Sequence, residues 1–255
     1  MDALSGGMTK RIDKSPYYLS PFVRIEAKRL KRYEHFIFDH FEHKTIISEQ
    51  DRRIIVHARN EEINIIPNGV DFDYFKPIAT PKKYDLIFTG NMSYPPNVNA
   101  ATFLVQQIMP LLWEKNDQIN AVIAGANPTR KVKLLASSKI QVTGWLEDIR
   151  EAYASSKIFV APMQIGSGLQ NKLLEAMAMG IPCITSQLAN NALKAKDNES
   201  ILIANTAEEF SNAILALLND HEKREAIAAA GNTYVKRRFN WDETTIELEK
   251  LFLTN

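Results

Sequence analysis

The sequence predicts an α/β fold in which a parallel sheet is covered by helices on both faces. Two observations lead to this prediction. From Tyr84 onward, short apolar segments alternate with longer amphipathic ones, a pattern that implies βαβ crossovers and parallel strands. The chain of 255 residues is 45% hydrophobic and 24% charged, which is ordinary globular composition and enough for one large or two modest domains.

Apolar segments with the length of buried strands recur after Tyr84. The expected strands are Asp85–Thr89, Ile119–Ala124, Ile140–Thr143, Lys157–Ala161, Cys183–Ser186 and Ser200–Ala204. The expected helices are Val98–Lys115 with an interruption at Pro110, Arg130–Ser137, Glu147–Ser155, Leu169–Met179 and one that begins at Thr206. A glutamate three residues after Thr206 completes a capping-box signature. This number of strands suits one doubly wound domain.

The segment before Tyr84 has too few strands to form a domain by itself. A helix is expected from Pro21 to about His40, with short strands at 44–47 and 64–66. The segment Lys76–Lys83 is polar and contains prolines, which is typical of a linker. The sequence therefore predicts a complete domain that is preceded by part of another.

The composition gives little support to several classes of function. A formal net charge of +1 gives no indication of nucleic-acid binding. The single cysteine, Cys183, lies in an apolar run and is expected in the core, so the sequence favours a cytoplasmic protein without disulfides. No apolar run is long enough to span a membrane. The histidines lack metal-ligand spacing, so no metal is expected, and neither a G-x-G-x-x-G nor a P-loop motif is present.

The stretch PMQIGSGLQNKLLEAMAMGIP, residues 162–182, carries the strongest functional signal. It is expected to form a strand end, a glycine-rich turn and a helix that Gly180 terminates. The free N–H groups at the start of such a helix bind anions well. Lys172 and Glu175 are three residues apart and share one face, where the lysine can neutralise a phosphate and the glutamate can accept hydrogen bonds from sugar hydroxyls. A structural interpretation stays open, in which this is a packing turn and the pair contributes only about 0.2–0.5 kcal/mol.

Several motifs in a fixed order then resemble a known family. They are IIPNGVDFDYF (65–75), FTGNMSYPPNVNA (88–100), VTGWLEDIREAYASS (142–156), GSGLQNKLLEAMAMGIPCITS (166–186) and FNWDE (239–243). This order resembles the C-terminal half of family 4 glycosyltransferases with the GT-B fold, and looks closest to a bacterial branch associated with exopolysaccharides. The resemblance covers essentially the whole chain.

The resemblance implies a Rossmann-like domain that binds a nucleotide-diphosphate sugar and transfers the sugar with retention, without a metal or other cofactor. It implies a partial acceptor-side domain and linker at residues 1–80, the nucleotide-sugar domain at 81–239, and a C-terminal helix at 240–255 that crosses back to the first part. The acceptor would be a carbohydrate or a lipid-linked sugar. Carried over by motif, the catalytic residues would be Lys172 and Glu175, and the nucleotide-sugar ligands would be Gly90, Asn91, Gly144, Trp145, Leu146, Gly168, Leu169 and Gln170.

The chain departs from the family pattern in two places. Ser167 stands where many members have the first glutamate of an E-x7-E pair, and Asn91 stands where many have arginine. Lys172 is therefore the remaining candidate for the phosphate charge. The resemblance also implies that much of an N-terminal domain is lacking, so a non-catalytic nucleotide-sugar-binding or interaction module is the alternative function. A sugar-nucleotide epimerase is a weaker alternative.

Two local alternatives concern side chains near the expected site. Trp145 could lie beside the base, but a tryptophan at a strand end more often packs, and packing is favoured. Asn97 could bind a ligand, but asparagine after two prolines is a common helix cap, and the cap is favoured.

Two surface properties are also expected. The basic run from Lys28 to Arg32 on an amphipathic helix is explained by a solvated face, with a peripheral contact to the inner face of an anionic membrane as the alternative. The apolar residues that would face an N-terminal domain predict self-association, or displacement of the first ~20 residues. These apolar residues are Val23, Leu30, Tyr33, Ile37, Phe239, Leu248 and Leu251.

Overall fold

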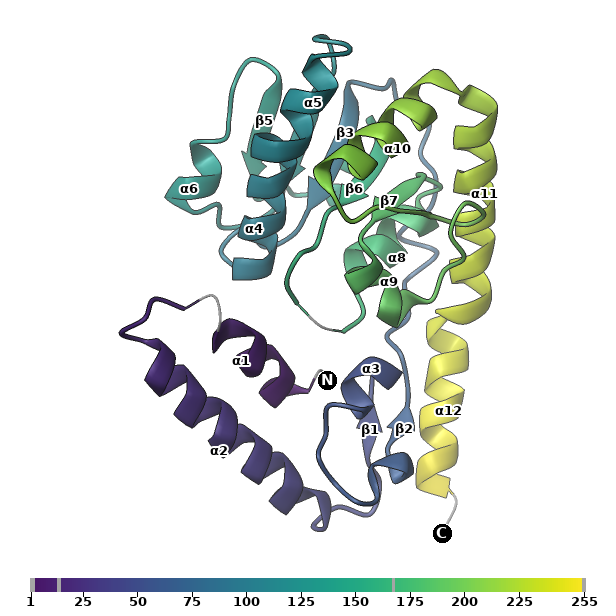
Figure 1. Cartoon of the computed structure of the whole chain (residues 1–255). Coiled ribbons are helices and arrows are strands. Elements are labelled where there is room, and N and C mark those ends of the chain that lie inside the picture. Colours follow the sequence, from purple (N-terminus) through teal and green to yellow (C-terminus); the bar gives the residue numbers. More distant parts are fainter. Residues whose placement is uncertain (1–2, 13–14, 167, 254–255) are drawn as a thin grey trace.

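A six-stranded sheet forms the centre of the larger part of the molecule (Figure 1). The computed structural model describes residues 3–12, 15–166 and 168–253. The strands are β3 (Tyr84–Thr89), β4 (Ala121–Ala124), β5 (Ile140–Gly144), β6 (Ser156–Ala161), β7 (Cys183–Thr185) and β8 (Leu202–Ile203). Their order is β5-β4-β3-β6-β7-β8, and every neighbouring pair is parallel. The parallel sheet of six strands predicted from the sequence is confirmed.

The strand order creates a crevice at the centre of the sheet. From β3 the chain moves outward to β4 and β5, and it then returns to the other side of β3 with β6. The connections that leave the carboxyl ends of β3 and β6 therefore run to opposite sides, and in open parallel sheets ligands bind at such a switch point. The central strands are buried apart from residues near their amino ends, as expected for a sheet covered on both faces.

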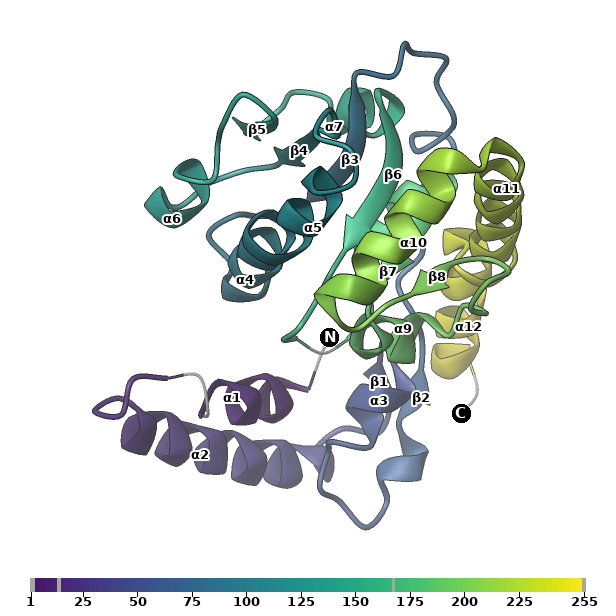
Figure 2. The ribbon, with the colours of Figure 1, turned by 45° about the horizontal axis from the view of Figure 1, so that its top comes forward.

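Helices cover both faces of this sheet (Figure 2). One face carries α4 (Pro95–Phe103), α5 (Met109–Trp113) and α10 (Ala207–Asn219), and α10 packs against α5. On the other face α8 (Asn171–Ala178) packs against α11 (His221–Arg238). The remaining helices of this part are α6 (Arg130–Lys133), α7 (Ile149–Ala154) and α9 (Gln187–Leu193).

The predicted interruption at Pro110 is wrong. The helix begins at Pro95 and passes through a π-helical segment, Leu104–Ile108, before it continues as α5. Met109 N–H bonds to the carbonyl of Leu104, five residues back, and Pro110 lies in the first turn of the segment that follows. Because the wider π turn comes just before it, the missing N–H of Pro110 falls at a position where the helix does not need it.

The ends of α8 and α10 agree with their sequence signals. Gly180 has a φ of +68°, and its N–H and that of Ile181 bond to carbonyls of the last helical turn. Thr206 and Glu209 form the predicted capping box at the start of α10. Helix α8 begins at Asn171 rather than at Leu169, because the glycine-containing turn extends to Gln170.

The first part of the chain is smaller and more open. Helix α1 (Leu4–Ile12), which the sequence did not predict, packs on α2 (Ser20–Phe38). Next come the parallel strand pair β1 (Thr45–Ile46) and β2 (Asn64–Ile65), the short helix α3 (Glu49–Arg52) and a 3-10 turn (Asn60–Glu62). Ser48 caps α3 by accepting from Asp51 N–H at 3.1 Å. The small core of this first part of the chain consists of Ala3, Phe38, Ile46 and Ile63.

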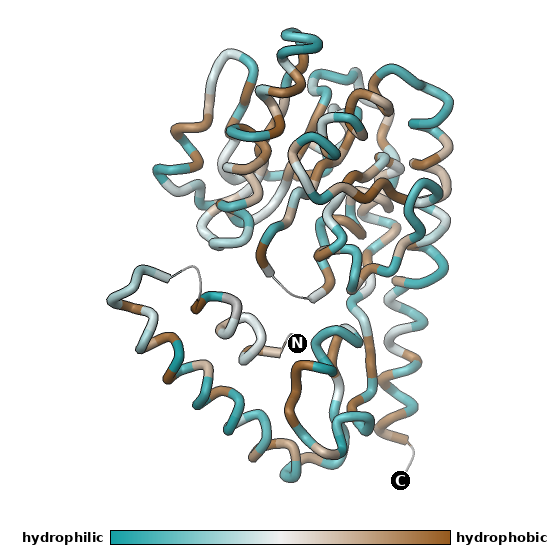
Figure 3. Tube along the Cα trace, viewed as in Figure 1, coloured by the Kyte–Doolittle hydropathy of each residue, from teal (hydrophilic) through white to brown (hydrophobic). Residues whose placement is uncertain are grey.

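The C-terminal helix α12 (Trp241–Leu253) runs back along this first part. Val70 pairs with Asn240, and the ring of Phe252 lies 5.8 Å from that of His43. In Figure 3 the hydrophobic colour concentrates on the strands of the large sheet, whereas α2 alternates between hydrophobic and hydrophilic residues along its length.

Candidate nucleotide-sugar site

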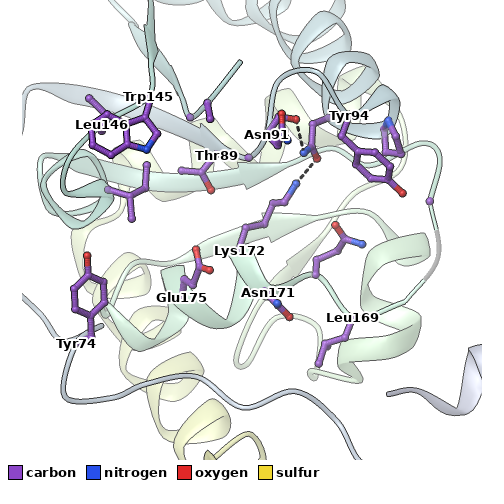
Figure 4. A pocket seen from close by; sticks show the side chains of 18 of the residues that line it. Tyr74, Thr89, Asn91, Tyr94, Trp145, Leu146, Leu169, Asn171, Lys172 and Glu175 are labelled. Carbon is purple, nitrogen blue, oxygen red and sulfur yellow. Dashed lines mark hydrogen bonds between the residues drawn. The ribbon is translucent and has the colours of Figure 1, made fainter. Parts of the chain in front are cut away.

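A cavity of about 580 Å³ opens at the carboxyl ends of the central strands (Figure 4). The loops after β3, β4 and β5 and the start of α8 surround it, together with Tyr74 from the segment 66–83 between β2 and β3; this whole segment is called the linker from here on. Its lining includes Tyr74, Thr89, Gly90, Asn91, Asn97, Gly125, Trp145, Leu146, Leu169, Gln170, Asn171, Lys172 and Glu175. The cavity therefore lies at the crevice that the strand order predicts.

Two glycines let the loops after β3 and β4 meet beneath the cavity. Gly90 has a φ of +152° and Gly125 a φ of +137°. A Cβ atom on Gly125 would lie 2.0 Å from the carbonyl oxygen of Gly90, and one on Gly90 would lie 2.6 Å from Nδ2 of Asn97. Any side chain at either position would therefore displace the backbone or the polar groups of the site.

Lys172 brings a cation into the cavity from the first turn of α8. Its ammonium donates to Oδ1 of Asn97 and lies 4.8 Å from the centroid of the Phe88 ring. Burial lowers the pKa of Lys172 to about 8, and the nearby Glu175 carboxylate opposes this shift. Asn97 in turn donates to the Asn91 carbonyl at 2.9 Å, so the lysine is held against the loop after β3.

Glu175 lies one turn further along the same face of α8. Its Oε2 accepts from the Tyr153 hydroxyl at 2.9 Å, and that hydroxyl lies 2.7 Å from Oγ1 of Thr89. Burial raises the pKa of Glu175, while the hydrogen bond from Tyr153 and the charge of Lys172 oppose that shift. Leu173, Leu174 and Met177 on the other side of the helix are buried, so α8 presents its core face to the sheet and its charged face to the cavity.

The turn before α8 brings further backbone to the cavity. Leu169 and Gln170 line it, and Gln170 is the N-cap residue of the helix without a side-chain cap bond. Asn171 accepts from Nδ2 of Asn68 at 3.2 Å, which links the turn to the linker. The predicted residue Ser167 lies outside the described residues.

Most of the residues expected at the site are brought together. Gly90, Asn91, Trp145, Leu146, Leu169, Gln170, Lys172 and Glu175 line the cavity. Gly144 and Gly168 do not line the cavity themselves, although each is followed directly by a residue that does, Trp145 and Leu169. The structure places these side chains around one cavity, and their roles with a ligand stay predictions.

Two interpretations favoured from the sequence are wrong. Trp145 does not pack in the core, because it is 71% exposed at the rim of the cavity. Asn97 does not cap α4, because the cap residue is Tyr94 and the Asn97 side chain bonds to Asn91 and Lys172.

Several residues that line or support the cavity were not predicted from the sequence. Thr89, Gly125 and Tyr74 line the cavity, and Tyr74 does so from the linker. Tyr153 supports it through the hydrogen bonds of its hydroxyl with Thr89 and Glu175. Gly125 follows a buried strand directly, a signal that could have revealed it. Within the described ranges, no cluster of three His, Cys, Asp or Glu residues could hold a metal ion. No helix in the described part of the chain is both long and apolar enough to cross a membrane.

The family model for glycosyl transferases group 1 matches residues 83–220. The chain belongs to the group 1 glycosyl transferases. It is 25% identical over 220 residues to the phosphatidyl-myo-inositol mannosyltransferase of Mycobacterium leprae, covering 82% of this chain and 58% of that protein. It is 26% identical over 180 residues to the UDP-Gal:alpha-D-GlcNAc-diphosphoundecaprenol alpha-1,3-galactosyltransferase of Escherichia coli, covering 62% of this chain and 46% of that one.

Solved structures share the fold of this group 1 chain. HepE of Anabaena, solved with UDP and glucose, aligns with a TM-score of 0.73 at 15% identity over 94% of this chain and 69% of that one. TarM aligns with a TM-score of 0.74 at 14% identity over 88% of this chain and 46% of that one. These neighbours have the GT-B fold, which confirms the predicted fold class. The family model confirms the predicted family. The chain spans about half to two thirds of the length of the curated relatives that it matches.

Proposed function

We propose that this chain binds a nucleotide-diphosphate sugar and supplies the donor side of a retaining glycosyltransferase. The observation that carries the proposal is the joint placement of Lys172 and Glu175 on one face of α8, inside the cavity at the switch point of the sheet. A cation at the helix start suits a diphosphate, and a carboxylate one turn away suits ribose hydroxyls. The family membership supports the same proposal.

In this proposal the protein stabilises the departing nucleoside diphosphate. Negative charge develops on the diphosphate as the bond between sugar and phosphate breaks. The Lys172 ammonium and the N–H groups of Leu169 and Gln170, residues that line the cavity, are proposed to meet that charge. Fixed donors of this kind stabilise a leaving group electrostatically and require no metal in the step.

The acceptor is proposed to approach from the first part of the chain. A second cavity of about 490 Å³ lies between α1 and the loop that follows β3. It shares Tyr94, Pro96 and Gly166 with the donor cavity, and α1 and α2 contribute mostly apolar side chains together with Arg11. We propose that residues 1–80 are acceptor-side, 81–239 donor-side, and 240–255 a helix that connects the two.

The outer face of α2 supports a peripheral membrane contact as part of this proposal. Phe22, Ile25 and Phe36 are 69%, 58% and 62% exposed along one stripe, and the basic residues Lys28 to Arg32 are exposed on the same helix apart from the half-buried Leu30. A basic amphipathic helix with aromatic residues can lie on an anionic surface at the inner side of a membrane. Contact with a second copy would cover the same apolar stripe.

Titration with UDP, GDP and ADP, followed by the matching diphosphate sugars, tests the donor proposal. Saturable binding of at least one nucleoside diphosphate is expected, and tighter or equal binding of one of its sugar derivatives. Absence of binding across all three bases would overturn the proposal. If binding occurs but no sugar transfer follows with any acceptor, even after a separate acceptor half is supplied, the non-catalytic module is the better description.

A further inference from the structure

Tyr74 enters the donor cavity from the segment between β2 and β3. It belongs to the motif IIPNGVDFDYF (65–75), but no role at the site was predicted for it from the sequence. It lies between β2 and β3 and lines the cavity, with 38% of its surface exposed. In Figure 4 its ring lies at the same end of the cavity as Trp145 and Leu146, on the opposite side. Glu175 lies between these residues and Lys172.

The ring and the backbone of Tyr74 are both held in place. The Arg150 guanidinium carbon lies 3.9 Å from the centroid of the Tyr74 ring, and Nη1 of Arg150 donates to the Tyr74 carbonyl at 3.2 Å. The Tyr74 N–H donates to Oδ1 of Asp71 at 2.9 Å. Asp148 receives two bonds from Nε of Arg150, at 2.8 and 3.0 Å, which fixes the orientation of the guanidinium against the ring.

This support extends to the core of the site. The ring of Phe75 lies 4.9 Å from Tyr74 and 6.4 Å from Tyr153, whose hydroxyl bonds to Glu175. A partly exposed aromatic ring fixed in this way loses little conformational entropy when a flat ligand packs against it. The Tyr74 hydroxyl also donates to Oδ1 of Asp148 at 3.4 Å, so both ends of the side chain are held.

The order of groups along the cavity indicates which part of a ligand meets Tyr74. With the diphosphate at Lys172 and the ribose at Glu175, as the proposed function holds, the base is the part that reaches the end formed by Tyr74, Trp145 and Leu146. We propose that Tyr74, backed by Arg150, is a base-binding wall that the linker contributes to the donor site. The inference rests on the proposed function and adds a specificity-determining residue to it.

This placement makes the linker part of the nucleotide site. Binding of the base would then hold the segment that joins the two parts of the chain, through Tyr74 and through the bond between Asn68 and Asn171 at the start of α8. A ligand that lacks a base would not engage this wall.

Calorimetry of Tyr74 variants with a nucleoside diphosphate, and competition by inorganic pyrophosphate, tests the inference. Because a base stacked on an aromatic ring contributes on the order of tenfold or more in affinity, Tyr74→Ala should weaken nucleoside diphosphate binding about tenfold. The affinity for pyrophosphate should change less than about twofold, since it has no base to stack. Tyr74→Phe should bind almost as wild type, and Tyr17→Ala, at an exposed tyrosine outside the cavity, is the matched control.

Equal weakening of both ligands, or unchanged nucleotide affinity in Tyr74→Ala, would overturn the inference. Tyr74→Leu keeps bulk at the position and decides the question in the same way if the alanine variant fails to fold. Failure of the wild-type chain to bind any nucleoside diphosphate would instead overturn the proposed function, so the two failures are distinguishable.

Discussion

Replacing Lys172 by alanine removes the cation at the start of α8, and nucleoside diphosphate binding should weaken strongly. The ammonium is partly buried and already positioned by Asn97, so a phosphate there would receive a charge-assisted hydrogen bond. Such a bond contributes about 1.5–3 kcal/mol, which corresponds to a loss of affinity of roughly 10- to 150-fold. Isothermal titration calorimetry at pH 7 measures the effect directly, with Lys236→Ala on the exposed side of α11 as the control.

The same lysine predicts a pH dependence of binding. Burial lowers the pKa of Lys172 to about 8, so in the free protein the side chain is mostly charged at pH 7 and mostly neutral at pH 9. A phosphate binds the charged form, and the affinity should therefore fall about tenfold between pH 7 and pH 9. Lys172→Arg should abolish this decline, because a guanidinium stays protonated throughout the range.

The melting temperature separates a ligand role from a structural one. Burial disfavours the charged form of Lys172, so the Lys172→Ala variant should have an unchanged or slightly higher Tm at pH 7. Wild-type affinity in Lys172→Ala, or a loss of affinity that a large fall in Tm fully accounts for, would refute the assignment of the diphosphate to this residue.

Three further predictions follow from the geometry. Glu175→Gln should reduce nucleotide affinity about tenfold with little change in Tm, because glutamine keeps an acceptor for Tyr153; a large fall in Tm with unaltered binding would mark the residue as structural. Gly90→Ala should lower both affinity and Tm, since its Cβ would lie 2.6 Å from Asn97 and 3.2 Å from Nζ of Lys172, whereas Gly7→Ala meets open space and is the control; equal behaviour of the two variants would contradict the steric account. The double variant Phe22→Ser, Phe36→Ser should lose flotation with anionic vesicles or show a smaller mass by light scattering, relative to Leu134→Ser on the donor side; no change in either readout would leave α2 without an interaction role.

The sheet could be predicted because its signal is local. Each central strand is a short apolar run, and such runs separated by helical segments permit few topologies. The end of α8 was also predictable, since Gly180 and Pro182 follow directly on the helix. Helix α11 was missed because it is rich in charged residues and buries only scattered positions, such as Ile227 and Val235, so its apolar period is weak.

The candidate site was predictable only where one segment supplied it. Lys172 and Glu175 stand in a single helical turn, and their spacing alone places them on one face. Asn97, Tyr153 and Tyr74 join them from three other segments, 75, 22 and about 100 residues away in sequence. Local preferences suggested a cap for Asn97 and nothing for Tyr74, because tertiary packing alone brings these side chains to the lysine and the glutamate.

A crystal structure grown with the nucleoside diphosphate that binds most tightly tests the central claim most directly. The account predicts density in the cavity at the carboxyl ends of β3 and β6, with the diphosphate within hydrogen-bonding distance of Nζ of Lys172 and the N–H groups at the start of α8. The ribose hydroxyls should then contact Glu175. A nucleotide bound outside this cavity, or bound in it with the base at Lys172 and the diphosphate beside Trp145, would contradict the account.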